Sequence, residues 1–235
     1  MRKQVLAVLA VVAALVGVGG AAAAGFVLSP VTMSVNPAES LSTFTTVTNS
    51  EEKPVEFTAE VMLWTQKDGK EVLTPARDAL VSPMRFKVAP GKAQVVRIAL
   101  RSTPKVSSVT YRLVLRQELQ PEAATEGRSS VTPRYVFSLP VFVEKPDARP
   151  ALSVTAQRVD GRVQLVFRNV GSGYAVLRQM QVVAGERRAD LGNQYVLPGS
   201  TMIVTLPAEL AGVSGLVLTG QDADQKVTRV NVNVP

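Results

Sequence analysis

The chain has 235 residues and a formal net charge of +7, and it contains neither cysteine nor histidine. Without cysteine there are no disulfides, so each domain must be held together by its apolar core. Without histidine there is no Ser-His-Asp triad, no imidazole metal ligand and no side chain that ordinarily titrates near neutral pH. These absences close most hydrolase mechanisms, and no motif supports an enzyme.

The N-terminus predicts export. Met1-Arg2-Lys3 is basic, residues 5–18 are almost wholly apolar, and residues 21–24 are all alanine. This order is typical of a secretory signal peptide, with Ala24 as the first choice for the cleavage site and Ala22 or Ala23 as alternatives. An uncleaved anchor is the alternative, but an apolar stretch of about 14 residues is short of the roughly 20 that a membrane span needs. Cleavage leaves enough chain for two ordinary domains.

The mature chain alternates apolar and polar residues with a period of two, as half-buried β-strands do. Stretches at 31–35, 55–63, 96–100 and 111–115 follow this pattern, and no long segment has a helical stripe. We therefore predict an all-β protein of two immunoglobulin-like sandwiches. The proline-flanked segment 146–150 is predicted to be a hinge between an N-terminal domain at 25–145 and a smaller C-terminal domain at 151–235.

A run of turn and core residues between Trp64 and Arg97 carries the most specific signal. Asp68-Gly69 is typical of a tight hairpin turn, and Pro90-Gly91 of a corner before the next strand. Together with Trp64-Thr65-Gln66 and Ser82-Pro83, this run resembles the N-terminal domain of the periplasmic chaperones that assemble chaperone-usher pili. The resemblance is strong over the first domain and weak over the second.

The resemblance implies that one strand of the first domain binds the partner protein. Chaperones of this family lend the last strand of their first domain to a pilus subunit whose own immunoglobulin-like fold is incomplete, which is a form of strand addition. Residues 135–143 form an apolar strand here, and Pro140 favours a position at a sheet edge because proline has no N–H to donate. We predict that the side chains filling the subunit groove are those of Val131, Tyr135, Phe137 and Leu139.

The chain departs from the family at the site that anchors the subunit's C-terminal carboxylate. Family members use two basic residues there, and the corresponding positions are Thr32 or Met33 on the first strand and Val141 on the donor strand. Another cation is expected to substitute, because charge-assisted hydrogen bonds hold a carboxylate best. The candidates are Arg112, the first choice, with Arg116 and Arg134. The alternative is that these arginines are merely solvated.

The expected partners are a fimbrial, pilus or spore-coat-like subunit and an outer-membrane usher, in the periplasm. The sequence leaves open whether the free chaperone covers its own edge by dimerising. No cofactor, metal or nucleic acid is expected, since the basic residues are scattered and Asp222-Ala223-Asp224 has the pattern of an acidic surface turn rather than of a calcium loop. The alternative function is a structural or adhesive secreted protein built from two immunoglobulin-like domains.

Overall fold

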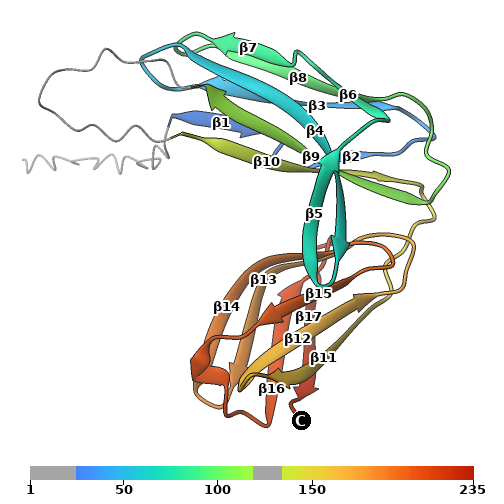
Figure 1. Cartoon of the computed structure of the whole chain (residues 1–235), viewed down its shortest axis with the longest axis vertical. Coiled ribbons are helices and arrows are strands. Elements are labelled where there is room, and N and C mark those ends of the chain that lie inside the picture. The colour runs from blue at the N-terminus through green and yellow to red at the C-terminus, as the bar shows by residue number, and fades with distance from the viewer. Residues whose placement is uncertain (1–24, 119–133) are drawn as a thin grey trace, which may run out of the picture.

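A computed structural model describes residues 25–118 and 134–235 and shows an all-β protein of two sandwiches (Figure 1), which confirms the predicted fold class. The predicted signal peptide lies outside the described residues. The first sandwich contains β1 (Phe26–Ser29), β2 (Met33–Val35), β3 (Ser42–Asn49), β4 (Val55–Lys67), β5 (Lys70–Pro75), β6 (Ala79–Ser82), β7 (Arg85–Val88), β8 (Ala93–Leu100), β9 (Ser108–Glu118) and β10 (Val136–Glu144). The second contains β11 (Leu152–Val159), β12 (Arg162–Asn169), β13 (Ala175–Ala184), β14 (Arg187–Val196), β15 (Thr201–Thr205), a short 3-10 helix (Ala208–Leu210), β16 (Gly215–Gln221) and β17 (Val227–Asn233).

The first segment of the chain belongs to both sheets of the first sandwich. One sheet has the order β1-β3-β8-β6, and the other has the order β2-β10-β9-β4-β5 with β7 also paired to β4. β1 pairs antiparallel with β3, and after Pro30 the chain crosses to the other sheet, where β2 pairs parallel with β10. The sequence predicted one strand at 31–35 and missed β1, because the apolar run from Phe26 to Leu28 directly follows the expected signal peptide.

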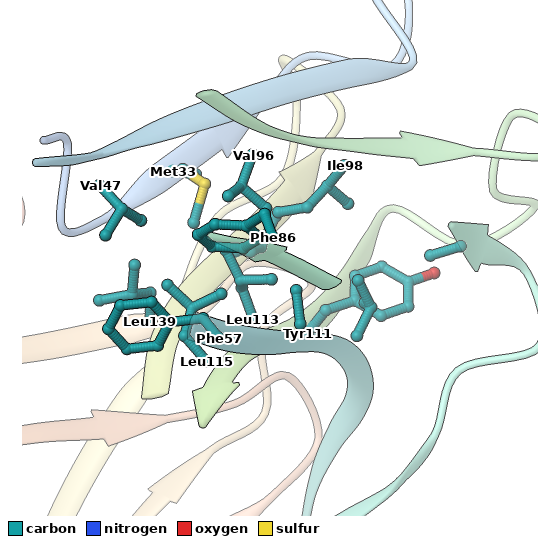
Figure 2. Close-up of a cluster of buried hydrophobic side chains, with 14 of the residues drawn as sticks. Met33, Val47, Phe57, Phe86, Val96, Ile98, Tyr111, Leu113, Leu115 and Leu139 are labelled. Carbon is teal, nitrogen blue, oxygen red and sulfur yellow. The ribbon is translucent and has the colours of Figure 1, made fainter. Parts of the chain in front are cut away.

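The core of the first sandwich lies between these sheets and contains the residues that the alternation predicted. Phe57, Tyr111, Leu113 and Leu115 are fully buried, whereas Arg112 between them faces away from the core. Figure 2 shows this cluster, to which β10 contributes Leu139. Burying an apolar side chain of this size contributes about 1.5 to 3 kcal/mol. The alternating pattern therefore fixes which face of each strand turns inward.

The second sandwich packs the sheet β11-β12-β15 against the sheet β14-β13-β16-β17. Its core includes Leu165, Phe167 and Met180, which are fully buried. The predicted Asp160-Gly161 turn joins β11 to β12 and has the positive φ angles, 50° and 71°, that such a turn requires. The two main core clusters lie on either side of 146–150. The domain boundaries and the hinge stay predictions.

Asn169, which is fully buried, holds the start of the second sandwich together. Its Nδ2 donates to the carbonyl oxygens of Gly173 (2.8 Å) and Val196 (2.9 Å), and its Oδ1 accepts from the N–H groups of Ala151 and Gly171, both at 3.0 Å. Four backbone groups thus depend on one amide.

We expect Asn169→Ala to lower the free energy of unfolding by at least about 2 kcal/mol, because each buried polar group left without a partner costs about 1 to 3 kcal/mol. Urea unfolding followed by circular dichroism measures the loss. The control is Asn231→Ala, since Asn231 is exposed on β17. Equal stability of the two variants would contradict the role assigned to Asn169.

Candidate functional site

One half of β10 has a free side. β10 pairs antiparallel with β9 along its whole length, from Val136 opposite Arg116 to Glu144 opposite Ser108. On its other side it pairs with β2 only at Val141–Val143. Among the described residues, Val136–Pro140 therefore has no neighbouring strand on that side, and we call this segment the open edge. Its position confirms that Pro140 lies where no N–H is required.

The open edge presents backbone hydrogen-bonding groups. The carbonyl oxygen of Tyr135 accepts from the N–H of Gln117 at 2.9 Å, so the odd-numbered residues of this strand direct their backbone groups toward β9. Strand geometry then directs the N–H and C=O groups of Val136 and Ser138 toward the free side. Unpaired groups of this kind are a template for another strand.

Three of the predicted groove-filling side chains, in β10 or just before it, lie on the core side of the strand. Leu139 is buried, whereas Tyr135 and Phe137 are half-buried at the margin of the core. The ring of Phe26 on β1 contacts both of them edge to face, with centroid distances of 5.4 Å to Tyr135 and 6.0 Å to Phe137. We call Phe26, Phe57, Tyr135 and Phe137 the aromatic seam. Val131, the fourth predicted residue, lies outside the described residues.

The aromatic seam lies where β1 faces the open edge of β10. Among the strands of the described residues, β1 is the last of its sheet and pairs only with β3, and Figure 1 shows β1 next to β10. Val136 and Ser138, of the opposite parity, point to the outer face and are exposed, Val136 by 55%. An added strand that binds the open edge would therefore meet the rings of Tyr135 and Phe137 on the core side, and exposed Val136 beside the polar Ser138 on the outer face. This arrangement is compatible with the predicted parity, which stays a prediction.

Arg112 lies next to the end of the open edge. It is opposite Pro140, whose neighbour Val141 pairs with Met33 on β2. The Arg112 side chain is only 13% exposed and is 3.1 Å from the Glu71 carboxylate. Its guanidinium also lies 3.7 Å above the ring of Trp64, within cation–π range. The structure thus gives Arg112 partners that sequence reasoning did not foresee.

The other two candidate arginines differ in their surroundings. Arg116 lies opposite Val136, and its Nη1 is buried without a hydrogen-bond partner among the described residues. Arg134 is more exposed, donates from Nε to the carbonyl oxygen of Gln117 at 2.7 Å and lies 3.8 Å from the Glu118 carboxylate. Arg112 and Arg116 therefore share the outer face of β9 at opposite ends of the open edge, and Arg134 lies just before it.

A third apolar cluster joins the two sandwiches, and no sequence pattern predicted it. Trp64 and Phe142 come from the first sandwich, and Tyr174, Tyr195 and Leu197 come from the second. We call these residues the interdomain cluster. The rings of Phe142 and Tyr174 stack at 3.6 Å, and Trp64 meets Tyr195 edge to face at 5.5 Å. Burial, with the nearby charge of Glu144, raises the pKa of Tyr174 above its ordinary value.

Asp222 and Asp224 form a turn. The Asp222 Oδ1 accepts from the N–H groups of Asp224 (3.0 Å) and Lys226 (2.9 Å), as in an Asx turn. Across residues 25–118 and 134–235, no group of three or more acidic side chains is arranged to hold a metal ion. Within the same ranges, none of the chain forms a helix of the length and apolarity that crossing a membrane requires.

No family model matches the sequence, and a search of curated proteins finds no match either. Solved structures do match. A chain of the CsuC–CsuE chaperone–tip adhesion subunit pre-assembly complex, from archaic chaperone-usher Csu pili of Acinetobacter baumannii, is 18% identical with a TM-score of 0.70, over 90% of this chain and 100% of that one.

Two further matches cover both sandwiches as well. The complex of Salmonella enterica SafA pilin with the SafB chaperone gives 13% identity and a TM-score of 0.62, over 88% of this chain and 95% of that one. The E. coli chaperone DraB gives 18% identity and a TM-score of 0.59, over 89% and 96%. The chain has the two-domain β-sandwich fold of the chaperones of chaperone-usher pili, as the resemblance of its first domain predicted.

Proposed function

We propose that this protein is a periplasmic chaperone that binds fimbrial, pilus or spore-coat-like subunits by lending them its β10 strand. The observation that carries the proposal is the open edge, where backbone groups of Val136 and Ser138, which no strand of the described residues pairs, lie next to the aromatic seam. A subunit with an incomplete immunoglobulin-like fold offers the complement, an apolar groove that lacks one strand. Strand addition supplies affinity through the backbone and specificity through alternate side chains.

The proposed binding needs no turnover chemistry. The subunit strand pairs with the free side of β10, and its core extends over Tyr135, Phe137 and Leu139, with Val131 extending the donor strand. The subunit's C-terminal carboxylate then lies near the end of the open edge, where Arg112 is the nearest of the three candidate arginines to the Met33–Val141 pair. After export by the signal peptide, the chaperone would pass the subunit to an outer-membrane usher.

The aromatic seam also explains how the free chaperone is expected to remain soluble. A long apolar edge strand is an aggregation hazard unless something covers it. Here Phe26 packs against Tyr135 and Phe137 and leaves them half-buried, so much of the apolar surface is already covered within the chain. A dimer that pairs two open edges would cover the rest in the absence of a subunit.

The test is purification of the tagged full-length protein from the periplasm of its own bacterium. A chaperone is expected to yield a stoichiometric complex with a small secreted protein that aggregates once the two are separated. An adhesive protein of two immunoglobulin-like domains would purify without such a partner, and a stable partner that stays soluble alone would also count against the proposal.

A further inference from the structure

The β4–β5 hairpin projects from the first sandwich and ends against the second (Figure 1). Gly69 at its tip is buried and forms an isolated parallel bridge with Met202 of β15. The carbonyl oxygen of Gly69 accepts from the N–H of Ile203 at 3.4 Å. A hairpin tip is ordinarily exposed to solvent, so this one is placed by contact with the other sandwich.

Gln66 fastens the same hairpin to the end of β14. Its Nε2 donates to the carbonyl oxygen of Tyr195 at 2.7 Å, and its Oε1 accepts from the N–H of Leu197 at 2.9 Å. A side-chain amide offers both a donor and an acceptor, and both are used here. One side chain of the first sandwich thus binds the backbone of the second at two points.

The interdomain cluster fills the space beside these hydrogen bonds. Trp64 and Phe142 are each 1% exposed, and Leu197 is 3% exposed. The ring contacts among Trp64, Phe142, Tyr174 and Tyr195 add to the stabilisation that burial of their area supplies. Domains of one chain move relative to each other by default unless their interface is large and apolar. Here the interface is apolar and carries specific hydrogen bonds.

We propose that the β4–β5 hairpin is a strut that sets the orientation of the second sandwich relative to the first, with Gln66 and Gly69 as its positioning residues. Trp64, on the β4 strand of the strut, contacts Arg112 of β9 and Phe142 of β10, which lies two residues beyond the open edge. The orientation of the second sandwich therefore shapes the space into which a bound subunit's C-terminus would extend. That last step rests on the proposed function, whereas the strut itself does not.

The chain offers a matched pair of glycines for testing the strut. Asp68-Gly69 and Asp160-Gly161 are turns of the same kind, with φ angles of 52° and 75° in the first and 50° and 71° in the second. A Cβ at Gly69 would lie 2.7 Å from Cγ1 of Ile203, whereas a Cβ at Gly161 would meet nothing within 4 Å. Asparagine tolerates positive φ at either site. Gly69→Asn and Gly161→Asn therefore impose the same backbone strain. Only Gly69→Asn also introduces a clash with Ile203 between the two sandwiches.

The experiment measures distances between spin labels on the two sandwiches of the full mature chain. Because the chain has no cysteine, Lys92→Cys and Glu186→Cys, at exposed turn positions, supply unique labels. We expect one narrow distance distribution for the parent and for Gly161→Asn. Gly69→Asn is expected to shift or broaden it, and so is Gln66→Glu, which places a carboxylate against the carbonyl of Tyr195. Gln94→Glu, on β8, is the control for the second change.

Unchanged distributions for both Gly69→Asn and Gln66→Glu would overturn the strut. If the distributions change, retention of the co-purified subunit by Gly69→Asn is expected to weaken by about tenfold, equivalent to about 1.4 kcal/mol. Unchanged retention would overturn the link between orientation and binding and leave the strut intact. The distance measurement involves no subunit, so failure of the proposed function itself would leave its result standing.

Discussion

Phe137→Asp is expected to abolish retention of a bound subunit. In the proposed complex this side chain fills an apolar groove, where a carboxylate without a partner costs several kcal/mol. The same ring packs against Phe26 and Phe57 in the free protein, at 6.0 and 6.2 Å, so the variant will also be less stable by up to about 3 kcal/mol. A domain with a stability of about 5 to 15 kcal/mol should remain folded after that loss.

The control for Phe137→Asp is Val136→Asp, which introduces the same charge at the neighbouring position of opposite parity, where the side chain is 55% exposed. Co-purification of subunit with each variant, beside thermal melts of the chaperone alone, separates binding from folding. We expect Val136→Asp to retain the subunit. The reverse result would reverse the parity of the donor strand, and retention by both variants would show that β10 is not donated.

The strands could be predicted from the sequence because burial of one sheet face imposes a period of two. Tyr111, Leu113 and Leu115 are buried as the alternation required, and Arg112 and Arg116 point to the outer face of the sheet. The open edge was foreshadowed by Pro140, whose missing N–H is a local property of one residue. Features of this kind depend on only a few consecutive residues.

The contacts between the sandwiches could not be predicted, because their partners are far apart in the sequence. Gln66 binds the backbone of Tyr195 and Leu197, and nothing near Gln66 identifies that target. The Trp64-Thr65-Gln66 run was informative only as part of a family resemblance. Its physical meaning, burial of Trp64 in the interdomain cluster and fastening of the hairpin, appears only once the second sandwich is in place.

The contacts of the candidate arginines could not be predicted from the sequence either. Glu71 reaches Arg112 from β5, so the cation that we propose as carboxylate anchor already has a carboxylate within 3.1 Å. A subunit carboxylate must therefore compete with Glu71 or share the guanidinium with it, which has donors enough for both. Glu71→Gln removes the competing charge and is expected to tighten binding if Arg112 is the anchor.

Arg112→Ala is expected to weaken subunit binding by at least about 30-fold, since breaking a buried hydrogen-bonded charge pair costs about 2 to 5 kcal/mol. Arg116→Ala tests the other partly buried candidate, and Arg97→Ala and Arg187→Ala are controls on the two sandwiches. Arg112 also stacks on Trp64, so loss of binding alone would not distinguish an anchor from a structural role.

The subunit's own carboxylate makes that distinction. A subunit amidated at its C-terminus is expected to bind the parent chaperone as weakly as the intact subunit binds Arg112→Ala. Combining the amidated subunit with Arg112→Ala is expected to reduce the affinity little further, because the effects of changing two groups that contact each other are not additive. If the two losses of affinity are additive, the carboxylate is held by another residue. The same comparison would then be made with Arg116→Ala and after it with Arg134→Ala. If amidation weakens binding to none of the chaperones, the bound subunit is not anchored through its carboxylate.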